Sequence, residues 1–370
     1  MKKTLSLLYI FVLLTACTSI SETTPTPPQV DTVIESDFTT TLTLVTLGAG
    51  RGVRGDWFEL YFTDPTSPLA SQETGGPDGP LANAIDEARL SVDVAIYSLS
   101  LNSIRDALLR AHDRGVRVRM VMESDNLDRS DPQKLKDAGI PILGDRREGL
   151  MHNKFVVIDN SEVWLGSMNF TDSGAYADNN NLMKIRSTKV AENFTTEFEE
   201  MFEDDIFGPD AGYGTPNPRV TIDGTPIDIY FSPDDHVQAA LVDLIGAAAQ
   251  DSIYFMAYSF TADPIGSVMR VSAADGLTVA GVMDADQIKS NLGTEFDPFS
   301  KAELDVYKDG IPGLMHHKVI IIDKSIVIFG SYNFTNSAET RNDETLVVIY
   351  NRDIAAQFME EFQIVFKAAQ

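Results

Sequence analysis

The segment LMHNKFVVID at residues 150–159 recurs as LMHHKVIIID at residues 314–323. The match continues downstream, where GSMNFT at residues 166–171 is repeated as GSYNFT at residues 330–335, at an unchanged offset of 164 residues. Two matches in one register indicate that the chain is a duplication of a unit of about 150 residues. The duplication decides the fold, because the same unit is expected to fold in the same way twice.

The order of apolar and amphipathic runs is the same in both units. In the first unit, β-rich apolar runs lie at 92–97 and 116–122, and a run with helical spacing lies between them at 101–113. The motif hairpin follows, and after it an amphipathic run at 194–202. Strands that alternate with helices predict an α/β fold, here two tandem α/β/α sandwich domains related by a pseudo-twofold axis.

The composition is that of an acidic folded protein. The 370 residues include 29 Lys plus Arg against 55 Asp plus Glu, for a formal net charge of −26, and 43% are hydrophobic. That hydrophobic fraction excludes a mostly disordered chain. The charge removes long-range attraction to nucleic acids and anionic lipid headgroups, because both are negatively charged. Cys17 is the one cysteine, which excludes an intramolecular disulfide and a cysteine-based zinc site.

The first residues have the pattern of a secretory signal. MKK at the start is followed by an apolar run at 5–14 and by LTAC at 14–17. The run is too short to span a membrane, which takes about 20 apolar residues. LTAC resembles the lipobox of bacterial lipoproteins, which implies that Cys17 is lipidated and becomes the mature N-terminus. It also implies an extracytoplasmic, membrane-anchored protein of the cell envelope, on the outer membrane or the outer face of the cytoplasmic membrane.

These observations divide the chain into five segments. We expect a signal peptide at 1–16 and, at 17–45, the lipidated cysteine with a flexible stalk rich in Ser, Thr and Pro. The first domain is expected at 46–207 and the second at 226–370, with a Gly- and Pro-rich linker at 208–225. A lipid on such a stalk would hold the domains at a membrane surface without a transmembrane helix.

The repeated motif brings three kinds of polar group together. His152 and Lys154 are two residues apart, so on a strand their side chains point to the same face. Asn169 follows the return strand of the hairpin and is expected beside them. Two such sets, joined across a pseudo-twofold axis, would form one site with two imidazoles, two ammonium groups and two carboxamides. The second set consists of His316, Lys318 and Asn333.

This set of groups suits a phosphodiester. Ammonium and carboxamide groups bind the non-bridging oxygens and stabilise the charge of the transition state. One imidazole attacks phosphorus while the other protonates the leaving oxygen, and the roles reverse when water enters. Histidine suits these roles because its ordinary pKa is about 6.5. The chemistry needs no metal ion and no other cofactor.

The two motifs resemble the signature of a known family. H-x-K-x4-D followed by G-S-x-N, present twice within residues 57–370, is similar to the signature of the phospholipase D superfamily. The resemblance implies that His152 is the nucleophile, that His316 is the acid, and that Glu344 orients a histidine. It also implies a set of phosphate-binding residues, namely Lys154, Lys318, Asn169 and Asn333. The remaining motif residues are implied to be structural, and these are Asp159, Asp323, Ser167 and Ser331.

The two units differ at one important position. The residue equivalent to Glu344 is Asn180. An amide can orient an imidazole but does not stabilise an imidazolium as a carboxylate does. Either the two histidines differ in basicity and divide the roles, or Asp178 substitutes for the carboxylate, or activity is weakened. Because both copies of the His, Lys and Asn set are present, we expect an active enzyme.

Three functions fit this sequence. The first is a metal-independent phosphodiesterase of the phospholipase D type that hydrolyses phospholipid headgroups through a phosphohistidine intermediate. The lipid anchor would hold it at its membrane substrate, and Phe296–Phe299 offers an apolar loop unless that segment serves only for packing. The second is a secreted endonuclease acting on single-stranded or duplex DNA, although the sequence contains no basic stripe. The third is a non-catalytic surface lipoprotein. We expect a monomer.

Overall fold

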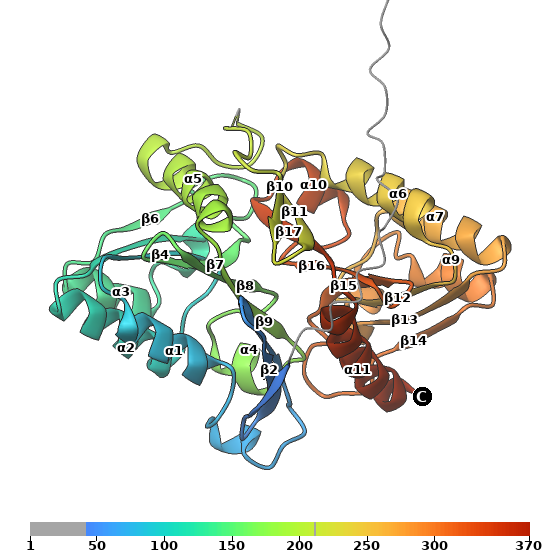
Figure 1. Cartoon of the computed structure of the whole chain (residues 1–370), viewed down its shortest axis with the longest axis horizontal. Helices are drawn as coiled ribbons and strands as arrows, with labels where there is room; N and C mark the ends of the chain where they lie inside the picture. Colours follow the sequence, from blue (N-terminus) through green and yellow to red (C-terminus); the bar gives the residue numbers. More distant parts are fainter. Residues whose placement is uncertain (1–41, 211) are drawn as a thin grey trace, which may run out of the picture. The chain divides into compact units, whose positions relative to one another are not determined.

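The computed structural model describes residues 42–210 and 212–370. The predicted signal peptide, the predicted lipidation site at Cys17 and most of the predicted stalk lie outside these residues. The described residues belong to one compact unit, which contains two β-sheets with helices packed against them (Figure 1). No helix in the described part of the chain is long and apolar enough to cross a membrane.

The first sheet is drawn in blue to green in Figure 1 and has the strand order β1-β2-β3-β9-β8-β7-β4-β5-β6. Neighbours are antiparallel except for β4, β5 and β6, which run parallel to one another. The strands are β1 (Thr43–Thr46), β2 (Gly50–Arg54), β3 (Phe58–Thr63), β4 (Ser91–Ile96), β5 (Arg117–Met122), β6 (Ile142–Gly144), β7 (Lys154–Ile158), β8 (Glu162–Gly166) and β9 (Asn181–Arg186).

The second sheet has the order β10-β11-β17-β16-β15-β12-β13-β14. From β3 and β11 onward the two orders correspond strand for strand, so the structure confirms two tandem α/β domains. The strands are β10 (Arg219–Ile222), β11 (Thr225–Ser232), β12 (Ser252–Ala257), β13 (Thr278–Met283), β14 (Asp305–Lys308), β15 (Lys318–Ile322), β16 (Ile326–Gly330) and β17 (Glu344–Tyr350).

Helices cover both sheets. The longest, α5 (Thr188–Asp204) and α11 (Arg352–Ala369), are the closing helices of the two units. The other α-helices are α1 (Asp78–Glu87), α2 (Asn102–Asp113), α3 (Ser130–Asp137), α4 (Asp172–Tyr176), α6 (Val237–Ala248), α7 (Asp263–Ala274), α8 (Ala285–Ser290), α9 (Phe296–Lys301) and α10 (Asn336–Thr340). Short 3₁₀ turns lie at Ala70–Gln72 and Ser124–Asn126.

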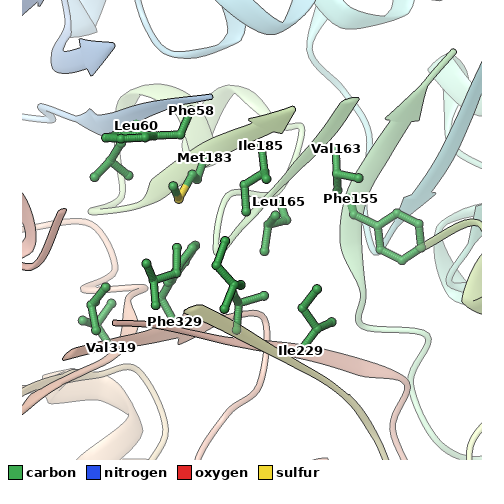
Figure 2. Close-up of a cluster of buried hydrophobic side chains, with 14 of the residues drawn as sticks. Phe58, Leu60, Phe155, Val163, Leu165, Met183, Ile185, Ile229, Val319 and Phe329 are labelled. Carbon is green, nitrogen blue, oxygen red and sulfur yellow. The ribbon is translucent and has the colours of Figure 1, made fainter. Parts of the chain in front are cut away.

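The two sheets share one hydrophobic core. Figure 2 shows side chains of the first sheet, such as Leu60 and Leu165, facing Phe329 and Ile229 of the second. Apolar residues of α5 and α11 complete this core. Two further cores lie on the outer faces, one between the first sheet and α1 to α3, the other between the second sheet and α6, α7 and α9. The central core fixes the two domains against each other, because burial of apolar surface favours contact between them.

Two strands fall where connecting segments were expected. β10 lies inside the predicted linker 208–225, and β1 begins inside the predicted stalk 17–45. β10 returns to β11 through Asp223 and Gly224, whose φ angles are 48° and 75°. Two adjacent left-handed residues form the tight turn of a β-hairpin, and an Asp-Gly pair is suited to it. This part of the Gly-rich segment is therefore a hairpin.

The apolar segment Phe296–Phe299 is part of the packing. Phe299 lies in α9, is fully buried, and contacts the rings of Phe255 and Phe260. The segment therefore holds α9 on the second sheet and does not form an apolar loop at the surface.

The two motif aspartates lie at the turns of their hairpins. The carboxylate of Asp159 accepts hydrogen bonds from the backbone N–H groups of residues 89, 90 and 91, where the chain enters β4. Asp323 accepts the equivalent bonds from residues 250, 251 and 252 at the start of β12. Each carboxylate ties the turn after a motif strand to the start of the neighbouring strand.

The loop before each motif strand pairs with the opposite domain. The N–H of His152 donates to the carbonyl of Asp343, whose own N–H donates to the carbonyl of Leu150. In the second contact the N–H of His316 donates to the carbonyl of Asn179, whose own N–H donates to the carbonyl of Leu314. Each histidine is therefore held at its backbone by a strand entry of the other domain.

Replacing Gly313 by Ala is expected to disturb one of these loops, because a Cβ there would overlap the carbonyl oxygen of Ala177 in the opposite domain. Overpacking of this kind costs about 1–3 kcal/mol, so the midpoint of thermal unfolding should fall by a few degrees. Gly214→Ala is the matched control, because a Cβ there meets nothing within 4 Å. Calorimetry on both variants makes the comparison, and an unchanged midpoint in Gly313→Ala would contradict the tight contact.

Candidate active site

The two motif histidines contact side chains of the opposite domains. Nδ1 of His152 lies 2.7 Å from Oε2 of Glu344, at the start of β17. Nδ1 of His316 lies 2.9 Å from Oδ1 of Asn180, just before β9. Both neighbours accept a hydrogen at Nδ1, so each neutral ring has its lone pair at Nε2. An imidazole with a free Nε2 lone pair can attack an electrophile or take up a proton.

The amide of Asn180 is fixed in orientation. Its Oδ1 also accepts a hydrogen bond from Ser167 Oγ, and its Nδ2 donates to the carbonyl of Gly174. These contacts keep the oxygen turned toward His316. In the described residues Asp178 makes no hydrogen bond to His152 or His316, and its Oδ1 instead accepts one from the N–H of Leu314. One imidazole therefore has a carboxylate neighbour and the other an amide.

The two motif lysines are buried without a counter-ion. Lys154 and Lys318 are 2% and 1% exposed. Each Nζ donates to the carbonyl of the preceding motif histidine, at 2.8 Å. Within the described residues neither ammonium lies in a salt bridge. A buried charge without a partner is unfavourable, so two of them in one place indicate a site for an anion.

Burial weakens the charged form of all four groups. It lowers the pKa of His152 to about 4, against the opposing effect of Glu344, and lowers the pKa of Lys154 to about 7. The pKa values of His316 and Lys318 are also lowered by burial, with neighbouring cations acting in the same direction. A phosphate anion among these groups would raise all four pKa values, because opposite charge favours the protonated forms.

The two motif asparagines follow the return strands of the hairpins. Asn169 lies just after β8 and Asn333 just after β16. In both residues Oδ1 is buried and has no hydrogen-bond partner among the described residues. The fold thus leaves hydrogen-bonding capacity in each carboxamide. The nearby motif serines have a structural role. The hydroxyl oxygens of Ser167 and Ser331 accept hydrogen bonds from the backbone at the starts of β9 and β17.

The residue between each motif His and Lys points away from this site. His317 is fully buried, its Nδ1 lies 2.9 Å from Nδ2 of Asn181, and its Nε2 lies 3.2 Å from Oε1 of Glu361 in α11. At the equivalent place Asn153 contacts Glu197 in α5. These contacts anchor the closing helices under the motif strands.

Two tyrosines to which the motifs assign no role adjoin the site. The Tyr97 ring centroid lies 5.2 Å from that of His152, and Tyr258 lies 4.7 Å from His316. Nζ of Lys318 lies 4.6 Å from the centre of the Tyr258 ring. The repeat itself carried the signal, because each tyrosine ends the apolar strand run that precedes the motif in its unit.

Comparison with known proteins identifies the family. A family model described as "Cardiolipin synthase, PLD-like domain" matches residues 81–202 and again residues 241–365, which together make up more than half of the chain. The chain belongs to the phospholipase D superfamily. One match falls within each of the two domains of the structure.

Curated relatives carry the names of lipid-cleaving members of the superfamily. A phospholipase D of Rickettsia bellii is 30% identical over 154 residues, which cover 40% of this chain and 76% of that protein. A mitochondrial cardiolipin hydrolase of Chlamydomonas reinhardtii is 29% identical over 121 residues, which cover 32% of this chain and 54% of that protein. The chain thus spans only about half the length of several of these relatives.

A solved structure has the same fold over most of the chain. The phosphatidylserine synthase of Haemophilus influenzae aligns with a TM-score of 0.59 and 14% identity, covering 78% of this chain and 84% of that one. At this identity the likeness concerns the fold alone.

The lowered pKa of Lys154 predicts how anion binding depends on pH. Above its pKa of about 7, Lys154 becomes neutral in the free protein, while a bound anion requires it charged. Affinity for sulfate, whose charge is constant in this range, should therefore fall by up to about tenfold per pH unit between pH 7 and 9. Calorimetry in buffers of different ionisation enthalpy should also detect proton uptake on binding. Lys154→Met is the control and should bind weakly, with a flatter pH dependence.

Proposed function

We propose that this protein is a phosphodiesterase of the phospholipase D type that hydrolyses phospholipid headgroups without a metal ion. Nε2 of His152 attacks phosphorus, and the bond from phosphorus to the headgroup oxygen breaks. His316 supplies the proton that the leaving alcohol needs. Water then attacks the phosphohistidine, His316 takes up a proton from it, and the bond from His152 to phosphorus breaks.

The observation that carries the proposal is the pair of buried ammonium groups without a counter-ion. Lys154 and Lys318 adjoin the two histidines, and no carboxylate of the described residues forms a salt bridge with either ammonium, although Glu344 acts on both from a greater distance. A phosphodiester shares one negative charge over two non-bridging oxygens, and each of these oxygens would accept hydrogen bonds from the ammonium and carboxamide groups. The in-line displacement then requires one imidazole on each side of phosphorus, which the pseudo-twofold arrangement of His152 and His316 supports.

The unequal neighbours of the histidines support a division of roles. Glu344 beside His152 would stabilise the positive ring that forms when Nε2 bonds to phosphorus. Asn180 orients His316 without adding negative charge, so a proton on His316 is held less tightly and is transferred more readily. This favours His152 as nucleophile and His316 as acid.

A lipid substrate is favoured over nucleic acid by the expected anchor, which would hold the protein at a membrane without electrostatic attraction. The net charge of −26 gives no attraction to a polyanion. A lipid on Cys17 would place the enzyme at a membrane of the cell envelope. The names of the relatives, phospholipase D and cardiolipin hydrolase, agree with a phosphodiester in a lipid.

The test is hydrolysis by the full mature chain in the presence of EDTA. Phosphatidylcholine, cardiolipin and single-stranded DNA are offered in parallel, and release of headgroup or phosphatidic acid supports the proposal. Nicking of DNA without lipid cleavage would make the protein an endonuclease. Inactivity on all three, with sulfate binding intact, would favour a non-catalytic binding protein.

The two histidine variants are expected to fail at different steps. With bis(p-nitrophenyl) phosphate, whose leaving group needs little protonation, His316→Ala should still form the phosphohistidine but hydrolyse it slowly. Acid-labile, base-stable phosphate on the protein, located by mass spectrometry at His152, should therefore accumulate in His316→Ala. His152→Ala should show none. Accumulation in His152→Ala instead would reverse the assigned roles.

Glu344→Gln should lower kcat by about 10²-fold or more, because the amide no longer stabilises the cationic ring of His152. The matched control is Asp343→Asn in the adjacent residue. Its carboxyl accepts a hydrogen bond from the N–H of Gly208, and an amide oxygen can do the same. Steady-state rates and sulfate affinity are measured together. Equal losses of kcat in the two variants would argue against a specific role for Glu344.

A further inference from the structure

We infer that two buried acids, Glu123 and Asp145, position the nucleophile His152 because they retain one proton between them and together hold the backbone beside it. The inference rests on the proposed function and deepens it, since it assigns a positioning role to two residues outside the repeated motif. Both act on the backbone at the entry of the motif strand, whereas Glu344 acts on the imidazole ring.

Both carboxylates accept a hydrogen bond from the same backbone N–H group. Oε2 of Glu123 lies 3.1 Å and Oδ2 of Asp145 lies 3.2 Å from the nitrogen of Met151, the residue before His152. Glu123 directly follows β5 and Asp145 directly follows β6, so the ends of two adjacent parallel strands bring the acids together. Two carboxylate oxygens therefore lie next to each other on a single donor.

The two acids are buried, and their other oxygens are also bound by the fold. Glu123 is 4% exposed and Asp145 is fully buried. Oε1 of Glu123 accepts a hydrogen bond from the N–H of Asp125, and Oδ1 of Asp145 accepts one from the N–H of Ser124. These two bonds fix the side chains, so the carboxylates are not free to turn away from each other.

No cation forms a salt bridge with either carboxylate in the part of the chain that the structure describes. Arg147 donates to the backbone carbonyl of Asp145, but its guanidinium pairs with the carboxylates of Asp205 and Asp210. Two ionised carboxylates on one N–H would repel each other strongly in a buried place. In agreement with this, burial and the charge of Asp145 raise the pKa of Glu123 to about 7. The pair therefore gains its second negative charge as the pH rises through this value.

Other charged and titratable groups face the pair from the elements packed around it. Burial raises the pKa of Tyr97 at the end of β4 and the pKa of Asp343 just before β17, and the pair contributes to both shifts. Lys154 loses its charge in the same pH range, so its effect must be separated from that of the pair. These groups are Tyr97, Asp125, Arg129, Arg147, His152, Lys154, Asp343 and Glu344.

The second charge acts on the nucleophile through the backbone. The pair holds the N–H of Met151, and the carbonyl of Asp343 in the opposite domain holds the next N–H, that of His152. Repulsion between two ionised acids would move a carboxylate off the Met151 N–H and shift the entry of β7. A shift of about 1 Å at a reacting group can lower a rate by roughly 10²-fold. Attack on phosphorus should therefore slow as the pair loses its proton.

The second unit provides a matched comparison. The N–H of Met315 donates to Oδ2 of Asp284 at 3.1 Å, whereas Asp309 accepts a hydrogen bond from a different N–H. One carboxylate thus holds the N–H before His316, and among the described residues no second acid shares it. The two units differ in the feature that the inference concerns, and the shared N–H lies on the side of the proposed nucleophile.

The first test observes the proton without any substrate. In the full chain, with methionine labelled for NMR, the amide resonance of Met151 should shift with an apparent pKa of about 7, because the charge on its two acceptors changes. The resonance is assigned with Met151→Leu. Glu123→Gln should remove the step, since the amide keeps an oxygen for the N–H of Asp125 and cannot ionise. The Met315 amide is the internal control and should show no step in this range.

The second test measures whether this proton controls attack by His152. The first turnover of bis(p-nitrophenyl) phosphate is followed at saturating substrate, where the bound anion keeps Lys154 charged. The rate should fall about fivefold or more between about pH 7 and 9 in the wild type, but less than about twofold in Glu123→Gln. Asp284→Asn is the matched control and should retain the wild-type fall. Asp145→Asn is a second variant that should also flatten the profile, should Glu123→Gln not fold.

Each outcome supports or overturns one point. A Met151 amide without the step, or with the step retained in Glu123→Gln, would overturn the inference and leave the proposed function standing. Equal falls in rate in the wild type and in Glu123→Gln would do the same, because the pair would then not act on the attack. A chain whose Met151 amide titrates but which cleaves neither bis(p-nitrophenyl) phosphate nor a phospholipid would overturn the proposed function, and the positioning of a nucleophile with it.

Discussion

The burial of two ammonium groups and two imidazoles in one place is the constraint on which the rest of this structure depends. Lys154 and Lys318 are almost inaccessible, and desolvating each charge costs roughly several kcal/mol. Among residues 42–210 and 212–370, Glu344 is the one carboxylate hydrogen-bonded to His152 or His316, so the positive groups are only partly compensated. The cost of burying these charges is reduced because the pKa values of the buried groups are lowered, as for Lys154. The central hydrophobic core holds the groups together. An anion in the site would relieve the same strain, which ties stability of the site to ligand binding.

The same constraint explains why neither domain forms the site alone. Each motif strand provides a His and a Lys, but the side chain that fixes the His comes from the strand entry of the other domain. Backbone hydrogen bonds from His152 to Asp343 and from His316 to Asn179 join the two domains beside these side-chain contacts. Duplication within one chain allows the two halves to diverge while they remain joined. The exchange of a carboxylate for an amide between Glu344 and Asn180 is such a divergence, and a symmetric dimer of identical chains could not make it.

Much of this could be predicted from the sequence, and the remainder depends on contacts between distant segments. The spacing of the motifs predicted the duplicated α/β fold, because periodicity and repeat length are local properties. The equivalence of Glu344 and Asn180 was also visible, but the histidine that each one contacts was not, because the packing of the two sheets decides it. Asp178 was a reasonable substitute by proximity in sequence, yet its carboxylate is occupied by the N–H of Leu314. Part of the segment 208–225, which the sequence predicts as a linker, forms strand β10 and its hairpin turn. A Gly- and Pro-rich composition is typical of both a hairpin turn and a linker, so composition alone does not distinguish them.

The charge distribution gives the final constraint on the substrate. A protein with a net charge of −26 that concentrates its buried cations at one point has a steep change of potential between its surface and its site. A polyanion meets repulsion over most of its length and attraction at a single phosphate. A substrate that presented a single phosphodiester to the lysines would avoid most of this repulsion, because only its phosphate would bring negative charge to the protein. The acidic surface therefore need not be an obstacle to binding a phosphate, provided that the rest of the substrate carries no further negative charge.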